Sequence, residues 1–468
     1  MSKNSRRTRW AIVACVVAPL VLTQCRLTDK LLEPQNPGLV DQDAVGTPAA
    51  ALALRIGAIG RIRNVVNGGD ERLWQAGGHL ADEYKNADFQ PNRADVDRRT
   101  IPTNNGNFPY TTVTQPRGFL RDAIRAMREF VPDSTSFRGE LYMGLGFIEM
   151  SLAENFCNGI PLGSTRNGEV TLGPPLTNAQ VFDSALLHVD SALTTLGSKT
   201  DANTVFIRQA TLILKARILV AKGDFASAAA LVPVATVPTN YQYLFTTSTG
   251  TNGGLEDNGH WNVQYSTHRM TVADSSDLIN GLPNRIMNAL PFASANDPRV
   301  PIFKTVPTQA EDGLTPFFQQ RIWSGRDDPI PMVSGIDARL IEAEGRLNAN
   351  DFAGMMTILN ALRTTSQRIG AYVVPVMPAL ATTPATKDAA ATLFFREKGF
   401  WTFGRGQRVS DLRRLMRQYG RAEDAVWPKG VYSFAGGASG TYGTDVNFPI
   451  PDGELINPAF TGCIDRKP

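Results

Sequence analysis

Apolar residues recur at helical spacing through the middle of the chain. Between residues 137 and 152 they fall on one face of a predicted helix, at Phe137, Leu141, Leu145, Ile148 and Leu152. The same spacing runs from 181 to 196, just after Thr177 and Gln180, which have the spacing of a capping box. A third apolar segment, 204–223, ends at a glycine, a common helix terminator. The pattern predicts several packed α-helices.

Two stretches share the pattern of a helix, a short turn and a second helix that starts with small residues. Setting the Asp-Phe-Ala turn at 224–226 on the one at 351–353 also places Ala216 on Ala343. Small residues allow two helices to approach closely, and so short a turn makes them antiparallel. The motif resembles tetratricopeptide units. Two unrelated helical hairpins are the alternative.

Four other stretches, 90–118, 233–275, 291–335 and 425–468, are rich in Gly, Pro, Asn, Thr and aromatic residues. They predict long loops, and loops of this length inside a compact domain are usually functional or packed as substructure. No linker divides the chain, so we expect residues 25–468 to form a single domain.

The N-terminus has the pattern of an export signal. Residues 1–9 carry four cations and no acid, and thirteen mostly apolar residues follow. That length is typical of a signal peptide and is short for a membrane-spanning helix. We therefore expect residues 1–24 to be removed from the mature protein.

The apolar run ends in "LTQC", which resembles a bacterial lipobox with Cys25 as the acylated residue. Gln24 departs from the pattern, which has a small residue there. Cys15 follows a better box, but too few apolar residues precede it. A cleaved signal with a soluble product is the alternative.

The composition gives no indication that the protein binds nucleic acid. The net charge is +3 with 19% charged residues, and no long basic tract or zinc-finger spacing suggests nucleic acid. Once the signal is removed and Cys25 is acylated, two free thiols remain, Cys157 and Cys463. The compartment outside the inner membrane is oxidising, so we expect them to form a disulfide. Two isolated buried thiols are the alternative.

The loops combine aromatic residues with amides and charged residues, which is the mixture a sugar-binding surface requires. Sugar rings stack on aromatic faces, while their hydroxyls need polar partners. The candidate ligand-binding residues are Trp261, Asn262, Tyr265, Trp74, Tyr84 and Trp323. The alternative for Trp74, Trp323 and Trp261 is a core position where a loop packs on a helix.

Signatures of catalysis are missing from the sequence. There is no H-E-x-x-H, no Cys-x-x-Cys, no G-x-S-x-G and no phosphate-binding loop. His260 and His268 lie in one loop, but two histidines do not make a metal site. Distant carboxylates could still converge for glycoside hydrolysis. We expect no cofactor, no metal and no enzymatic activity, with a hydrolase as a minor alternative.

The order of several short motifs resembles the SusD/RagB-like outer-membrane nutrient-binding lipoproteins. After Cys25 comes "LLEPQNPG", then "LADEYKNADFQPNRADVDRRTI", "FCNGIPL", "NDPRVPIF", "ARLIEAEGRLN", "REKGFWTFGRGQRVSDLRRL" and "NFPIPDGELINPAF". One departure is Arg405, which stands where the family helix usually has Glu. Arg408 and Asp411 match the family pattern, and their spacing predicts a structural ion pair.

The resemblance implies an all-α fold of tetratricopeptide-like helical hairpins with a loop-rich ligand-binding half. It implies a lipid-anchored protein on the outer face of an outer membrane. The ligand would be an oligosaccharide or, less often, a peptide, handed to a partner SusC-like TonB-dependent transporter. An exported helical-repeat scaffold that binds only proteins is the alternative, and the absence of a neighbouring transporter gene would favour it.

Replacing Cys25 tests the anchor. Each buried CH₂ of an acyl chain contributes about 0.8 kcal/mol, so several chains hold a protein on a membrane nearly permanently. The Cys25→Ala protein should therefore move from the membrane fraction to the soluble fraction. Incorporation of labelled palmitate into Cys25→Ala would show that the assignment is wrong and would point to Cys15.

Overall fold

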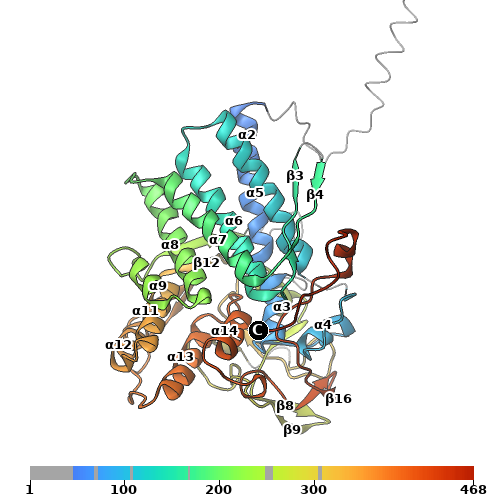
Figure 1. Ribbon diagram of the computed structural model, residues 1–468. Coiled ribbons are helices and arrows are strands. Elements are labelled where there is room, and N and C mark those ends of the chain that lie inside the picture. Colours follow the sequence, from blue (N-terminus) through green and yellow to red (C-terminus); the bar gives the residue numbers. More distant parts are fainter. Residues whose placement is uncertain (1–45, 68–71, 106–108, 167–168, 248–256, 304–307) are drawn as a thin grey trace, which may run out of the picture. The chain divides into compact units, whose positions relative to one another are not determined.

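The computed structural model describes residues 46–67, 72–105, 109–166, 169–247, 257–303 and 308–468 (Figure 1). Ala51–Pro468 form one compact unit. The predicted signal peptide, residues 1–24, and Cys25 lie outside the described residues. No helix within the described ranges is long and apolar enough to cross a membrane.

Most helices pack side by side with helices that are close to them along the chain. Thus α6 lies between α5 and α7, α8 packs on α7, and α11 contacts α9, α12 and α13 (Figure 1). The longer helices are α2 (Pro48–Val66), α5 (Tyr110–Phe130), α6 (Thr135–Asn155), α7 (Asn178–Leu196), α8 (Ala202–Lys222), α11 (Gly335–Asn348), α12 (Phe352–Arg363), α13 (Lys387–Trp401) and α14 (Arg408–Arg417). The shorter ones are α3 (Leu73–Leu80), α4 (Pro91–Asp97), α9 (Phe225–Leu231), α10 (Gly259–Trp261), the π-helix η2 (Asn262–Ser266) and the 3₁₀ turns η3 (Glu423–Ala425) and η4 (Asp452–Ile456).

The predicted helical hairpins are present. Each of the two aligned turns starts its second helix with the same cap, in which an aspartate accepts a backbone N–H three residues on. Asp224 accepts from Ser227 at 3.1 Å at the start of α9, and Asp351 accepts from Gly354 at 2.8 Å at the start of α12. These caps satisfy N–H groups that would otherwise lack a partner. The all-α, tetratricopeptide-like fold class is confirmed.

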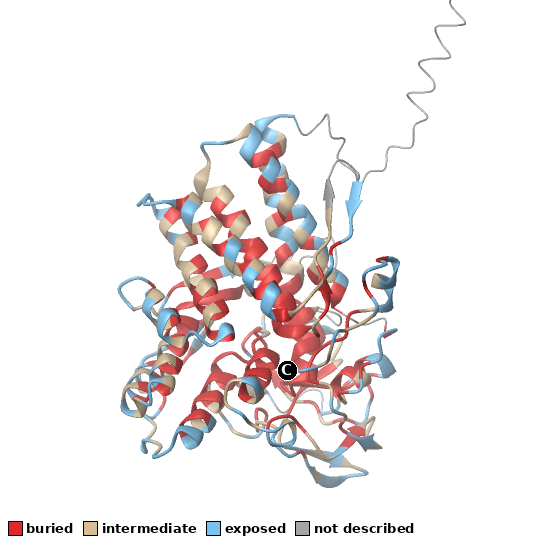
Figure 2. Ribbon diagram, in the orientation of Figure 1, coloured by how far each residue is buried: buried red, intermediate tan, exposed pale blue. Residues whose placement is uncertain are grey.

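Helix α6 is buried on nearly every side, where the sequence predicted one apolar face. From residue 139 to 155 only Tyr142 is not buried (Figure 2). Its buried carboxylates are neutralised by arginines from neighbouring helices: Arg117 Nε lies 2.8 Å from Glu149, and Arg217 lies 2.9 Å from Glu154. Unpaired charges could not be buried at such positions, so α6 is the central helix of its group.

The strands among the described residues form two-stranded antiparallel pairs, with no larger sheet. The prediction of a long loop at 90–118 is wrong, because this stretch contains α4 and the start of α5. One group is formed by β1 (Tyr84–Asn86) with β7 (Met270–Val272), β8 (Ser276–Ile279) with β9 (Leu282–Arg285), β10 (Ile302–Phe303) with β11 (Gln319–Gln320), and β6 (Gln242–Phe245) with β12 (Ile330–Ser334). The others are β2 (Ile160–Pro161) with β5 (Pro175–Leu176), β3 (Ser164–Arg166) with β4 (Glu169–Thr171), β13 (Gln367–Ile369) with β14 (Tyr372–Val374), and β15 (Val431–Phe434) with β16 (Gly437–Thr441).

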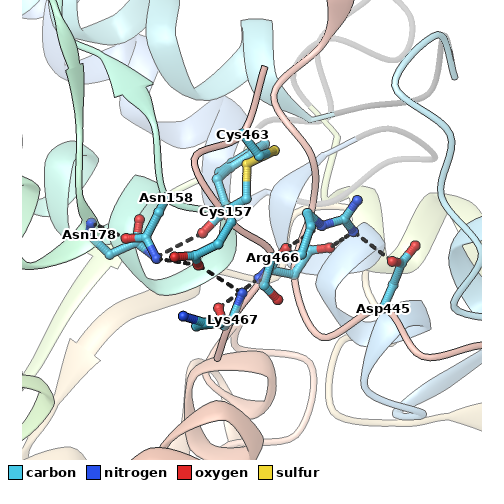
Figure 3. The surroundings of a disulfide bond; sticks show 10 residues. Cys157, Asn158, Asn178, Asp445, Cys463, Arg466 and Lys467 are labelled. Atoms are coloured by element: carbon cyan, nitrogen blue, oxygen red, sulfur yellow. Dashed lines mark hydrogen bonds and ion pairs between the residues drawn. A yellow bond between two sulfur atoms is a disulfide. The ribbon is translucent and has the colours of Figure 1, made fainter. Parts of the chain in front are cut away.

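A disulfide joins the end of α6 to the C-terminal segment, between the two cysteines expected to pair (Figure 3). Cys157 and Cys463 are 306 residues apart, and their Cα atoms are 5.9 Å apart. Hydrogen bonds reinforce the junction: Asn158 donates to Asp465 at 2.8 Å. By the chain-entropy model, closing so long a loop contributes an upper estimate of about 5 kcal/mol. The bridge fixes the last residues, which would otherwise fray.

Candidate ligand-binding site

Helices α10 and η2 form a rigid shelf at the surface. Asn258 caps α10, because its side-chain oxygen accepts the backbone N–H groups of His260 and Trp261 at 2.9 and 3.1 Å. The same side chain donates to the carbonyl of Asp328 at 2.8 Å. The chain continues directly into η2, and π-helical turns are frequent at functional sites.

Two aromatic residues and a cation share the outer side of this shelf. Trp261 and Tyr265 are both partly exposed, and the guanidinium of Arg326 lies 5.9 Å from the centre of the Trp261 ring. Arg326 is held there by Asp257, whose carboxylate accepts from Nε at 2.6 Å. We name Trp261, Asn262, Tyr265 and Arg326 the Trp261 surface. It offers aromatic faces together with amide and guanidinium groups.

Tyr265 is fixed at its far end. Its hydroxyl donates to the backbone carbonyl of Gln320 at 2.8 Å. Partial burial raises the pKa of Tyr265 to about 12, although nearby Arg321 lowers it. The ring is therefore neutral at physiological pH, and the bond to Gln320 is maintained.

A buried amide holds the shelf on the rest of the protein. Gln264 accepts from the backbone N–H of Gln320 at 2.9 Å and donates to the carbonyl of Met270 at 2.6 Å. Gln319 donates to the backbone carbonyl of Gln264 at 2.8 Å. Because all these partners are buried and directional, η2 has one position on β7 and β11.

Three of the six candidate ligand residues lie beneath the surface. Trp74, Tyr84 and Trp323 are exposed by only 2%, 0% and 0%. They cannot present a face to a ligand in this structure, so the core alternative holds for Trp74 and Trp323, and the prediction of Tyr84 as a ligand residue is wrong. The structure brings Trp261, Asn262 and Tyr265 together at the surface and places the other three in the interior.

The buried rings pack on a tight turn between α13 and α14. Gly404 and Gly406 both have φ of +66°, a conformation that favours glycine. A Cβ on Gly404 would lie 2.7 Å from the Tyr84 hydroxyl, and one on Gly406 would lie 2.1 Å from the Trp74 ring. Trp323 also contacts this turn, 3.0 Å from the position of a Gly404 Cβ. Only glycine allows the rings this close approach.

Trp323 connects this turn to the shelf. Its ring stacks on His260, with centroids 4.2 Å apart and planes 22° apart. Burial lowers the pKa of His260 to about 3, so the imidazole is neutral. Gln75 lies 2.8 Å from its Nδ1. His260 is therefore a packing residue, and among the described residues no group of three or more His, Cys, Asp and Glu could hold a metal ion.

Arg405 between the two glycines anchors the turn. Its guanidinium donates to Asp337 at 2.5 Å, and Gln407 donates to the other oxygen of the same carboxylate at 2.9 Å. Asp337 also accepts from the backbone N–H of Ser334 at 2.7 Å, which completes a capping box at the start of α11. Burial alone would raise the pKa of Asp337, but Arg405 and Gln407 bring it below its ordinary value.

No direct Arg408–Asp411 salt bridge is present among the described residues, although Asp411 raises the pKa of Arg408, which burial lowers. Asp411 accepts instead from Lys398 at 2.6 Å and from Arg414 at 3.2 Å. Arg408 lowers the pKa of Glu83, which burial raises to about 8. The spacing within one helix suggested a pair, but Lys398 on α13 reaches the carboxylate, and the sequence does not show how α13 packs.

Asp257 positions the site, and nothing in the sequence predicted this role. It lies 69 residues before Arg326, and no local pattern links the two. The only signal was indirect, since an arginine beside an exposed aromatic ring requires a partner to stay in place.

No family model matches the chain, and no curated protein matches it. Solved structures do. A SusD-like carbohydrate binding protein from Bacteroides vulgatus is 13% identical, with 90% of this chain and 98% of that chain covered and a TM-score of 0.59. The surface glycan-binding protein A from Bacteroides uniformis is 14% identical, with 89% and 99% covered and a TM-score of 0.60. A laminarin binding SusD-like protein gives the same identity, coverage and TM-score. At these identities the likeness shows the fold, and it agrees with the resemblance found in the sequence.

The Asp337–Arg405 pair leads to a stability prediction. Asp337→Asn leaves a buried guanidinium without its carboxylate, which should cost about 3–5 kcal/mol of unfolding free energy. The folded-state pKa of Asp337 lies below its unfolded value, so the wild-type advantage should be present above the unfolded pKa and shrink as pH falls through the folded one. Urea unfolding of the wild-type and Asp337→Asn proteins at several pH values measures the loss of unfolding free energy and its dependence on pH.

The matched control is Asp424→Asn. Asp424 pairs with Lys429 at 3.4 Å, and the two side chains are 65% and 38% exposed. Exposed pairs contribute about 0–1 kcal/mol. Equal losses in the two variants would show that the buried pair does not hold the turn.

Proposed function

From the premise that this chain has the fold of SusD-like proteins, we propose that it binds an oligosaccharide at the Trp261 surface. Several proteins of this fold are described by their names as binding carbohydrate, glycan or laminarin. The single observation that carries the proposal is the placement of Trp261. Of the tryptophans within the described residues it is the only one that is not buried.

The chemistry of the surface suits a sugar. Aromatic rings offer a flat apolar face to the C–H side of a pyranose, and polar side chains around the rings form hydrogen bonds with its hydroxyls. Trp261 and Tyr265 supply the faces, four residues apart on α10 and η2. Arg326 supplies several N–H donors in a fixed fork, held by Asp257.

The rigidity of the shelf supports binding as well. Asn258 and Gln264 fix its backbone before any ligand arrives. Preorganised groups lose little conformational entropy when a ligand binds. The rings are open to solvent on one side, which suits a mostly solvated ligand such as a sugar chain.

The wider role follows from the same proposal. The protein captures an oligosaccharide and hands it to a SusC-like TonB-dependent transporter, without breaking a bond. Acylation of Cys25 would hold it on the outer face of the outer membrane. Tethering beside the transporter gives a high effective concentration, so moderate affinity suffices.

Calorimetric titration against a panel of oligosaccharides and peptides tests the proposal. For the glycan that binds best, Trp261→Ala should weaken affinity at least several-fold, because stacking contributes about 0.5–1.5 kcal/mol beyond lost burial. Its melting temperature should change little, since the ring is partly exposed.

Phe119→Ala is the matched control. Phe119 is an aromatic residue, 41% exposed, on α5 and outside the Trp261 surface. It should leave glycan affinity unchanged. A Trp261→Ala protein that binds as tightly as wild type, or a panel in which only peptides bind, would overturn the proposal.

A further inference from the structure

A cavity of about 310 Å³ lies between the β1–β7 pair and the β8–β9 hairpin. Its walls are mainly apolar, and the buried part includes Val272, Ala273 and Ile286. Two lining residues on the hairpin, Leu278 and Pro283, are exposed to solvent, so the cavity is not closed on that side. No residue of the Trp261 surface lines it. Ligand pockets are commonly of this size, about 300–1,000 Å³, and mostly apolar.

One polar group in this cavity lacks a partner. Asp82 lines it and is 2% exposed, and its Oδ2 makes no hydrogen bond with any described residue. Buried polar atoms almost always have a partner, because leaving one unpaired costs about 1–3 kcal/mol. Asp82 therefore borders a cavity of ligand size and has hydrogen-bonding capacity that the described residues leave unused.

The neighbouring cation does not fill that role. Lys85 also lines the cavity, but its ammonium donates to Asp277 at 2.6 Å and to the carbonyl and hydroxyl of Ser433 at 2.9 and 2.7 Å. An ammonium group has three N–H donors, and these three bonds use them. No cation is left in the cavity for an anionic ligand.

The protonation state of Asp82 further restricts the class of ligand that fits the cavity. Burial first, and then the carboxylates of Asp97 and Asp277, raise its pKa well above the ordinary range, while Lys85 and Arg408 lower it less. The carboxyl is thus favoured in its protonated form, which can donate a hydrogen bond. A mainly apolar cavity whose buried part has an O–H donor suits a neutral molecule that has an acceptor oxygen.

We propose that this cavity binds a compact, neutral, apolar molecule, about the size of one substituted aromatic ring, whose carbonyl oxygen accepts from Asp82. A free sugar does not fit this chemistry, because its many hydroxyls would face apolar walls. The site is therefore separate from the Trp261 surface in place and in ligand class. This proposal does not depend on whether the Trp261 surface binds a glycan.

Acetophenone and ethylbenzene form a matched pair of probes. They are nearly equal in size, and only acetophenone has a carbonyl oxygen. Both are titrated into full mature protein with isotope-labelled methyl groups. Both should shift the methyl resonances of Val272, Leu278 and Ile286. Acetophenone should bind about two- to tenfold more tightly, the value of one hydrogen bond to a neutral acceptor.

Two variants and a control separate the cavity from unspecific binding. Ala273→Leu fills the cavity and should abolish both sets of shifts. Asp82→Gly should keep binding but remove the preference for acetophenone, and glycine accepts the φ of +57° found at this position. Leu282→Ser, on the same hairpin but 70% exposed and outside the lining, should change nothing.

Three outcomes would overturn the proposal. One is the absence of shifts in wild-type protein at the solubility limit of both probes. Another is binding that persists in Ala273→Leu. The third is equal affinity of wild-type protein for the two probes. Thermal unfolding of the same samples identifies any variant that has merely failed to fold, and the preference of wild-type protein remains decisive in that case.

Discussion

The buried pair of Asp337 and Arg405 links the helical part of this protein to the loops that carry the Trp261 surface. Asp337 starts α11 through a capping box and at the same time binds Arg405 in the turn between α13 and α14. That turn has the two glycines on which Trp74, Tyr84 and Trp323 pack. Trp323 stacks on His260, and the next residue is Trp261. A continuous series of contacts therefore runs from one ion pair to the exposed ring.

This arrangement explains how a loop-rich region can hold a defined surface. The strands of this region are short pairs, which have little stability alone. Their position depends on buried amides such as Gln264 and on the aromatic floor beneath them. Polar networks of this kind specify one geometry when all members are satisfied. The Trp261 surface is rigid because the buried amide of Gln264 and the stacked rings of His260 and Trp323 hold the backbone beneath it.

The sequence predicted the features that depend on nearby residues. Helix spacing, the capping box at Thr177 and the turns at 224 and 351 are local, and each is found in the structure. The pairing of Cys157 with Cys463 was expected because no other partner was left for either. Features that depend on contacts between distant parts of the chain could not be predicted from the sequence in the same way. Trp74 and Trp323 look like Trp261 in the sequence, and only the packing of the turn at Gly404 separates core from surface. The contacts Lys398–Asp411, Asp257–Arg326 and the cavity beside Asp82 all join segments that no periodicity relates.

The claim that Trp261 contacts the sugar can be measured on unmodified protein. The other described tryptophans are buried, so a surface oxidant such as N-bromosuccinimide should react with Trp261 first. Peptide mass spectrometry then gives its oxidation rate with and without the tightest-binding oligosaccharide at saturation. The account predicts that bound glycan slows oxidation of Trp261 strongly and leaves the exposed methionine Met287 unaffected. Oxidation of Trp261 at the same rate in the free and the saturated protein would contradict it.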